Sequence, residues 1–169
     1  MSIYLIRTVR EDDLNNIVKI EKECFPEAEA ATDEQFKQRI KNFGNHFFVL
    51  EYANVIIGFI NGMITNETTI SDEMYSDSTL HNEKGSWQTV FGLDIIKNFR
   101  RKGHASLLMK EMINKAKEEN RQGVILTCKE NLISFYKRFG FCEKGISKSV
   151  HGGAVWYDMI LDFEKEEIN

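Results

Sequence analysis

The stretch Asn98–Asn120 reads NFRRKGHASLLMKEMINKAKEEN, and it follows a β-branched and apolar segment that ends at Ile96. After Gly103 the apolar residues are spaced so that they fall on one face of a helix; they are Ala105, Leu108, Met109, Met112, Ile113 and Ala116. The sequence therefore predicts a strand, a turn and an amphipathic helix in direct succession.

The turn before this helix has the composition of an anion-binding site. The first N–H groups of a helix lack intrahelical acceptors, and the peptide dipoles place partial positive charge at that end. Gly103 lets the main chain approach a ligand closely, and the basic segment Arg100–Lys102 adds charge. A phosphate or pyrophosphate ligand is indicated, although the sequence has neither a GxxxxGK[ST] loop nor a GxGxxG loop after a strand.

Two motifs carry a resemblance to a known family. Arg100-x-x-Gly103-x-Ala105 is similar to the [QR]-x-x-G-x-[GA] loop of the GCN5-related N-acetyltransferases (GNAT). Downstream, FYKRFGF at Phe135–Phe141 resembles the tyrosine-bearing helix and Gly-Phe strand start of that family. The C-terminal half most resembles arylalkylamine N-acetyltransferases, through CKENLISFYKRFGF at Cys128–Phe141 and the His-Gly-Gly turn before Trp156.

The order of predicted elements agrees with this family over nearly the whole chain. Strands are expected at residues 3–9, 46–51, 55–65, 87–96, 124–128, 141–150 and 154–163, and helices at 11–24, 33–42, 103–120 and 130–138. Residues 66–85 read as a long acidic loop with a helical turn at 74–80, and Thr32 and Gln35 as a capping box. The resemblance implies an α/β (α+β) fold, a mixed central sheet of about seven strands with helices on both faces and a splayed parallel pair in the middle. We expect one N-acetyltransferase domain at residues 1–163 and a frayed tail at 164–169.

Composition narrows the class of protein. Apolar residues make up 42% and charged residues 28%, which is typical of a globular domain, and the net charge of −4 argues against nucleic acid as a partner. Three cysteines without metal-like spacing predict reduced thiols. No apolar run approaches the ~20 residues that cross a bilayer, and a signal peptide is not evident. We therefore expect a cytoplasmic monomer or homodimer with no membrane partner.

The resemblance implies acetyl-CoA as cosubstrate. Main-chain amides from about Arg101 to Ser106 would hold its diphosphate, and the main chain at about Leu93–Ile95 would bond to its pantetheine. The side chain of His104 is expected to point to solvent or to cover the cofactor. The predicted cofactor-binding residues are Leu93, Asp94, Ile95, Arg100, Arg101, Lys102, Gly103, His104, Ala105 and Ser106.

Catalysis is assigned by the same resemblance. Tyr136 matches the family's general acid, which protonates the departing thiolate; the alternative is a half-buried core tyrosine. The histidine pair of the vertebrate arylalkylamine enzymes is replaced here by Thr89 and Phe91. A carboxylate is the natural substitute as proton acceptor, Glu29 first and Glu27 second, unless both are solvated loop charges.

Other acidic and histidine residues remain open. Asp94 is a further candidate base if its side chain faces the gap, which alternation along a strand leaves undecided. Glu27, Glu29 and His151 are predicted to bind the amine, with a surface turn as the alternative for His151. The four histidines, His46, His81, His104 and His151, show no metal-ligand spacing, so no metal is expected.

The resulting prediction is an acetyl-CoA-dependent N-acetyltransferase that acts on a primary amine. A small cationic or arylalkyl amine is preferred because of the C-terminal resemblance and the acidic loops. The alternatives are an acetyltransferase for peptide or protein amines and a non-catalytic module that binds acyl-CoA as a sensor.

Overall fold

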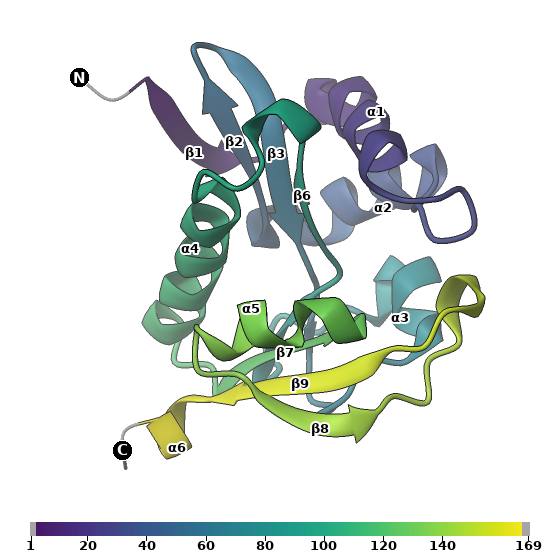
Figure 1. Cartoon of the computed structure of the whole chain (residues 1–169), viewed down its shortest axis with the longest axis vertical. Coiled ribbons are helices and arrows are strands. Elements are labelled where there is room, and N and C mark those ends of the chain that lie inside the picture. Colours follow the sequence, from purple (N-terminus) through teal and green to yellow (C-terminus); the bar gives the residue numbers. More distant parts are fainter. Residues whose placement is uncertain (1–2, 167–169) are drawn as a thin grey trace.

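A computed structural model describes residues 3–166 of the 169-residue chain. Its strands form two sheets, and the chain runs directly from one sheet into the other (Figure 1). The first sheet is antiparallel and has the order β1 (Tyr4–Thr8), β2 (Phe47–Tyr52), β3 (Val55–Asn61) and β6 (Gly92–Ile95). The second is mixed and has the order β4 (Ile64–Thr65), β5 (Trp87–Val90), β7 (Gly123–Cys128), β9 (Tyr157–Asp162) and β8 (Cys142–Ile146).

Helices cover both faces of the first sheet. In Figure 1, α4 (His104–Glu118) lies on one side of β3 and β6, and α1 (Leu14–Cys24) and α2 (Asp33–Phe43) lie on the other. The shorter helices are α3 (Asp72–Ser76), α5 (Ile133–Lys137) and α6 (Phe163–Glu166), with 3-10 turns at 11–13, 44–46, 78–80, 97–99, 130–132 and 151–153. The predicted mixed α/β fold with helices on both faces is confirmed.

Within residues 3–166, nine strands replace the seven predicted ones, because two of the predicted strands are broken. The strand predicted at 55–65 is interrupted at Gly62 and Met63, where the chain passes from the first sheet to the second. The strand predicted at 87–96 is interrupted at Phe91. There the N–H of Phe91 donates to the carbonyl of Asn61 at 2.7 Å, although Gly92 is the residue in register with Asn61. This is the pattern of a β-bulge, which inserts one extra residue and bends the strand.

The bulge separates two strands that would otherwise run side by side. Before it, β5 pairs in parallel with β7, up to Val90 opposite Leu126. After it, β6 pairs with β3 of the other sheet. The sheet therefore opens between β6 and β7, which confirms the splayed parallel arrangement predicted for the middle of the fold.

The local signals that predicted the helices have the expected physical form. Thr32 Oγ1 accepts the N–H of Gln35 at 3.1 Å, and Gln35 Oε1 accepts the N–H of Thr32 at 2.9 Å, so the predicted capping box is confirmed. The apolar stripe of α4 packs between the two sheets, with Leu108, Met109 and Met112 fully buried. Complete burial of such a side chain stabilises a fold by roughly 1.5–3 kcal/mol.

The C-terminal strands are shorter than predicted. β8 ends at Ile146 and β9 begins at Tyr157, so residues 147–156 form a loop rather than a tight turn. Asp72 of α3 holds this loop, because its carboxylate accepts hydrogen bonds from Ser149 Oγ and from the N–H of Val150. Of the predicted frayed tail, residues 164–166 belong to α6, and residues 167–169 lie outside the described part of the chain. No helix within residues 3–166 combines the length and apolar character needed to cross a membrane.

Candidate active site

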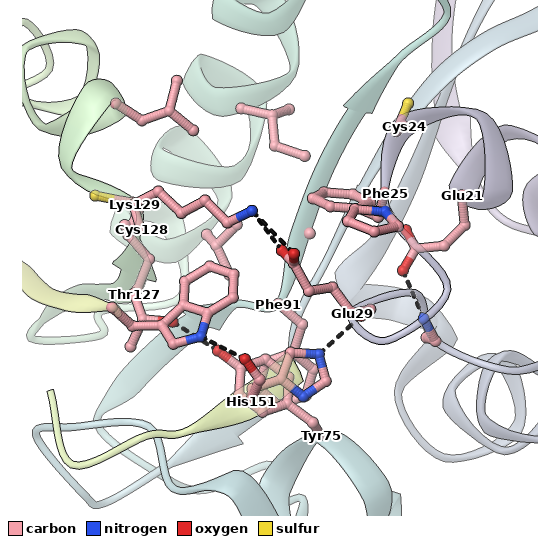
Figure 2. Close-up of a pocket in the computed structure, with 18 of the residues that line it drawn as sticks. Glu21, Cys24, Phe25, Glu29, Tyr75, Phe91, Thr127, Cys128, Lys129 and His151 are labelled. Atoms are coloured by element: carbon pink, nitrogen blue, oxygen red, sulfur yellow. Dashed lines mark hydrogen bonds and ion pairs between the residues drawn. The ribbon is translucent and has the colours of Figure 1, made fainter. Parts of the chain in front are cut away.

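A cavity of about 270 Å³ occupies the place where β6 and β7 diverge (Figure 2). Its walls come from the end of α1 and the loop at 25–31, from α2 and α3, from both splayed strands, from α5 and from the loop at 147–156. The residues used below that line it are Glu21, Phe25, Glu29, Arg39, Tyr75, Phe91, Gly92, Leu93, Lys129, Tyr136, His151 and Trp156.

The main chain of β6 presents unpaired groups to this gap. The N–H of Ile96 donates to the carbonyl of Ile57 at 2.9 Å, so in an antiparallel ladder the alternate residue Asp94 also bonds to β3. Leu93 and Ile95 then direct their N–H and C=O groups away from β3. The carbonyl of Ile95 accepts a hydrogen bond from Arg100 Nε, so the main chain of Leu93 and the N–H of Ile95 are the groups of the predicted segment Leu93–Ile95 that face the gap, and Asp94 offers none.

The helix α4 begins with an open N-terminus. Gly103 is its N-cap residue and has a φ of +87°, a left-handed conformation that glycine adopts without strain. No side chain caps the helix and its first turn has no acidic residue. Arg101 and Lys102 lie beside it and are exposed. The first turn, which includes Ala105 and Ser106, therefore has the features of an anion-binding site.

The side chain of Arg100 bonds to β6 and α1. Its Nε donates to the carbonyl of Ile95 at 2.8 Å, and its Nη2 lies 3.3 Å from Cys24 Sγ. The guanidinium therefore fixes the end of β6 against α1, which differs from the expectation that Arg100 adds to the phosphate-binding charge.

The side chain of His104 also departs from its predicted position. The ring is buried under the start of α4 between Tyr4 and Phe99, instead of pointing to solvent or over the cofactor. Its Nδ1–H donates to the carbonyl of Phe99 at 2.8 Å. This hydrogen bond holds the ring of His104 inward, so only the main chain of His104 remains at the proposed diphosphate site.

Tyr136 lies on α5 and lines the cavity with only 8% of its surface exposed. Its ring packs edge-on against Phe135 and Phe141. Burial raises the pKa of its phenol above the ordinary value of 10.0, with smaller contributions from neighbouring groups. The hydroxyl is therefore protonated at neutral pH, as a proton donor must be. Tyr136 is thus a core aromatic that also lines the cavity, and its role as general acid stays a prediction.

Glu29 lines the cavity too, but its carboxylate has a partner. Lys129 Nζ lies 2.8 Å from one oxygen and 2.9 Å from the other, and the Glu29 side chain is 7% exposed (Figure 2). Both oxygens of this carboxylate therefore face a single ammonium group. Glu27 is exposed and does not line the cavity, because the loop turns its side chain to solvent. The sequence offered no signal for Lys129, which comes from the other end of the chain.

His151 connects the two loops that border the cavity. Its Nε2–H donates to the carbonyl of Glu29 at 2.7 Å, and its ring stacks on Tyr75 with centroids 5.1 Å apart. The carbonyl of His151 accepts the indole N–H of Trp156 at 2.8 Å. His151 is therefore a wall residue of the cavity rather than a solvated turn residue. Thr89 bonds to the carbonyl of Met63 in the sheet, whereas Phe91 lines the cavity.

Two charged residues of the cavity wall escaped the sequence analysis. Glu21 falls within the apolar stripe of α1, and Arg39 falls on the buried face of α2. A charged residue at an apolar position of an amphipathic helix was the available signal, because burial of a charge requires a partner. Arg39 donates to Asn61 Oδ1 at 3.2 Å and to the carbonyl of Tyr75 at 2.9 Å.

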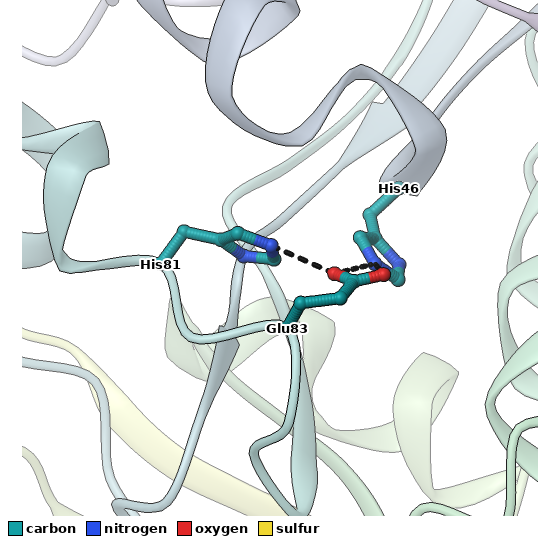
Figure 3. Close-up of side chains that lie close together, drawn as sticks. All are labelled: His46, His81 and Glu83. Atoms are coloured by element: carbon teal, nitrogen blue, oxygen red, sulfur yellow. Dashed lines mark hydrogen bonds and ion pairs between the residues drawn. The ribbon is translucent and has the colours of Figure 1, made fainter.

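A second titratable cluster lies away from the cavity. His46, His81 and Glu83 place nitrogen and oxygen atoms within 4.8 Å of one another, as metal ligands would (Figure 3). Both Nε2 atoms contact Glu83 Oε2, at 2.7 and 2.8 Å. However, His81 Nδ1 accepts the N–H of Ile64 at 3.0 Å, so the neutral ring carries its proton on Nε2. A ligating histidine donates from its second nitrogen instead, and we interpret the cluster as two neutral rings that donate to one carboxylate.

This cluster predicts a loss of stability in acid. Burial disfavours the charged rings and lowers the pKa values of His46 and His81 below 6.5. Below about pH 6.5 the unfolded chain therefore binds protons that the folded chain does not, so the free energy of unfolding decreases as the pH is lowered. We expect Tm to drop between pH 7.5 and pH 5 by roughly 2–4 °C for each pKa unit involved. The Tm of His81→Gln should drop less than that of the wild type. A wild-type Tm that is constant over this pH range would contradict the interpretation.

Comparison with known proteins gives a family match over most of the chain. The model of the acetyltransferase (GNAT) family matches residues 14–141. Among curated proteins, a probable hydrolase, YhcX of Bacillus subtilis (strain 168), is 23% identical over 97 aligned positions, and the alignment covers 54% of this chain. The aligned part is 19% of that protein, so this chain spans about a fifth of the length of that relative.

Solved structures share the fold over their full length. The loading GNATL domain of CurA from Lyngbya majuscula has a TM-score of 0.83 at 15% identity, covering 96% of this chain and 98% of that one. Naa50 of Arabidopsis thaliana, solved with the bisubstrate analogue CoA-Ac-MVNAL, has a TM-score of 0.75 at 18% identity, covering 95% of this chain and 99% of that one. At these identities the likeness establishes the arrangement of the elements.

Proposed function

Since this chain belongs to the acetyltransferase (GNAT) family, we propose that it moves the acetyl group of acetyl-CoA to the primary amine of a small cationic or arylalkyl acceptor. The observation that carries the proposal is a set of three features, two of which line the cavity while the third begins the helix that follows β6. They are the unpaired main chain of Leu93, the uncapped N-terminus of α4 and the protonated side chain of Tyr136.

The cosubstrate fits the groups available on this chain. Main-chain N–H and C=O groups of β6 match the amide groups of pantetheine, which bond to an extended strand as another strand would. The N–H groups at the start of α4, with Arg101 and Lys102 beside them, suit the diphosphate. The surface above Gly103 is open, because a Cβ atom at that position would meet no atom within 4 Å.

The chemistry needs a proton for the departing thiolate. Transfer forms a bond between the amine nitrogen and the acetyl carbon and breaks the bond from that carbon to sulfur. Tyr136 is the proposed donor to the sulfur, because its phenol is protonated and lines the cavity beside the end of β7. A positioned general acid of this kind contributes roughly a hundred- to ten-thousand-fold to rate.

The walls of the cavity favour a small amine that carries a ring or a positive charge. Phe25, Tyr75, Phe91 and Trp156 provide apolar and π surfaces that pack rings and attract cations. The loops at 25–31 and 147–156 are joined through the bond from His151 to the carbonyl of Glu29. An extended peptide would need a groove between these loops, so the bond supports a small acceptor.

The finer assignments are part of the same proposal. Membership of the arylalkylamine group within the family rests on the C-terminal motifs alone, and Naa50, with its peptide-bearing analogue, marks peptide amines as the competing acceptor class. A cytoplasmic location is supported by the three unpaired cysteines, Cys24, Cys128 and Cys142.

The test is an acceptor screen with acetyl-CoA that follows the release of free thiol. The panel contains arylalkylamines, polyamines and short peptides with free N-termini. We expect kcat/KM for the best small amine to exceed that for every peptide by at least tenfold, since one lost methylene-sized contact already changes the ratio by roughly that factor. A peptide as best acceptor would overturn the substrate class.

Two further outcomes bear on the enzyme itself. Binding of acetyl-CoA without thiol release for any amine would favour the acyl-CoA sensor. Thiol release that is unchanged when the amine is omitted would identify hydrolysis rather than transfer.

The matched control for the cavity is Lys144→Ala. Lys144 is an exposed lysine on β8 away from the opening, so this substitution should leave the acceptor ranking unchanged.

A further inference from the structure

Two buried carboxyl groups meet behind one wall of the cavity. Asp94 on β6 is 1% exposed and Glu21 on α1 is 6% exposed. A Cβ atom built on Gly92 would lie 3.2 Å from Asp94 Oδ1 and 4.0 Å from Glu21 Oε1. Gly92 and Glu21 both line the cavity, so the carboxyl pair lies beside it.

Asp94 has no conventional partner. Within residues 3–166, neither of its oxygens receives a hydrogen bond from an N–H or hydroxyl donor. Glu21 Oε2 accepts the N–H of Ala31 at 2.8 Å, which leaves its Oε1 on the side of Asp94 and the cavity. A buried carboxylate without a donor is strongly disfavoured, so a structural role does not account for an aspartate at this position.

The two groups must share a proton. Two adjacent carboxylates in a buried site cannot both ionise, and they titrate as a pair. Burial, followed by the charge of Glu21, raises the pKa of Asp94 well above its ordinary value of 3.8. The pair therefore holds one proton and one negative charge at neutral pH.

The surrounding groups are consistent with a single negative charge. Arg39 lies at the same wall and remains charged, although burial lowers its pKa to about 10. Its guanidinium is held by Asn61 and by the carbonyl of Tyr75, and it balances one carboxylate. The titratable groups that face the pair from the elements packed around it are Arg39 of α2, Cys24 of α1, Tyr75 of α3 and Tyr136 of α5.

We propose that this pair is the proton acceptor of the reaction, with Glu21 taking the proton from the substrate amine and Asp94 positioning and sharing it. The inference rests on the proposed acetyl transfer and assigns that role to Glu21 instead of Glu29, whose carboxylate forms an ion pair with Lys129. Glu21 is the catalytic member because it lines the cavity, and Asp94 acts through it.

The protons balance as follows. An incoming ammonium gives one proton to the Glu21 carboxylate and becomes a neutral amine. Its nitrogen bonds to the acetyl carbon while the carbon–sulfur bond breaks, and the thiolate receives the proton of Tyr136. The phenolate recovers a proton from the acylated nitrogen, so the products are the amide, the free thiol and one proton left on the pair. That proton returns to solvent when the product leaves.

The experiment compares Glu21→Gln and Asp94→Asn with the wild type, and uses Glu34→Gln as the control. Glu34 is an exposed carboxylate on α2 that pairs with Gln38. We expect Glu21→Gln to lower kcat about a hundredfold. Asp94→Asn should lower it about tenfold and shift the acidic limb of the kcat/KM profile, because an amide at this position cannot share a proton with Glu21. The control should match the wild type.

A second readout does not depend on activity. A raised pKa in the folded state means that the stability contributed by Asp94 is present below its ordinary pKa and is lost as pH rises through the raised one. Asp94→Asn removes this loss, so its Tm at pH 8 should exceed that of the wild type by roughly 2–4 °C. Glu34→Gln should show no such gain.

The outcomes separate the two proposals. A wild type that acetylates amines, with Glu21→Gln within twofold of it or with an unmoved limb in Asp94→Asn, would overturn the carboxyl pair and leave the proposed function standing. A wild type inactive on every amine would overturn the function. In that case the Tm of Asp94→Asn still decides whether the pair shares a proton, and parallel Tm curves against pH would refute it. Should Glu21→Gln fail to fold, the isosteric Asp94→Asn decides alone.

Discussion

Tyr136→Phe is expected to lower kcat by roughly a hundred- to ten-thousand-fold while the dissociation constant for acetyl-CoA changes little. The substitution removes only the hydroxyl. The ring that packs against Phe135 and Phe141 remains, so the core around α5 is preserved. What is lost is the proton for the thiolate, because the described cavity residues include no second buried phenol beside the end of β7 except Tyr75, whose hydroxyl already bonds to Thr127 at 2.7 Å.

The measurement is steady-state thiol release with the best acceptor, together with calorimetric titration of acetyl-CoA. Tyr157→Phe is the matched control, since Tyr157 lies on β9 and does not line the cavity. It should behave as the wild type. Equal turnover in Tyr136→Phe would remove the general-acid role and leave Tyr136 as a core aromatic.

Gly103→Val is expected to weaken acetyl-CoA binding at least a hundredfold. Gly103 has a φ of +87°, which a β-branched residue adopts only at a cost of order 1–3 kcal/mol. Relief of that strain rotates the N–H groups of the first turn of α4, and the new side chain projects into the open space above them. Two charge-assisted hydrogen bonds at roughly 1.5–3 kcal/mol each would account for this loss.

The control shares the backbone strain but not the site. Gly145 in β8 has a φ of +94°, and a Cβ atom there also meets nothing within 4 Å. Gly145→Val should therefore lose similar stability and keep its affinity. Calorimetry below both unfolding temperatures makes the comparison, and equal affinities in the two variants would show that the start of α4 does not hold the diphosphate.

The sequence predicted those features of the fold that depend on residues close together in the chain. The stripe of α4, the capping box of Thr32 and Gln35, and the glycine before α4 each depend on neighbours within a few residues, and each lies where it was expected. The parallel pairing of β5 and β7 also follows from a strand, a helix and a strand in succession.

The composition of the site depends on contacts that no local pattern contains. Lys129 reaches Glu29 from the end of β7, and Glu21 of α1 meets Asp94 of β6. Arg100 and His104 lie in the predicted loop, yet their side chains turn to the carbonyls of Ile95 and Phe99. A side chain selects among several nearby acceptors, and only the folded chain fixes which are near.

The break at Phe91 has a wider meaning for this fold. In a sheet whose neighbouring strands all pair, the N–H and C=O groups of the inner strands bond to one another and none is available to a ligand. The extra residue opposite Asn61 makes the second half of the strand pair with β3, so the sheet opens between β6 and β7 and the main chain of Leu93 faces the opening. The capacity to bind a ligand in the middle of the molecule thus comes from the β-bulge. Deletion of its one extra residue would restore continuous strand pairing and close the opening.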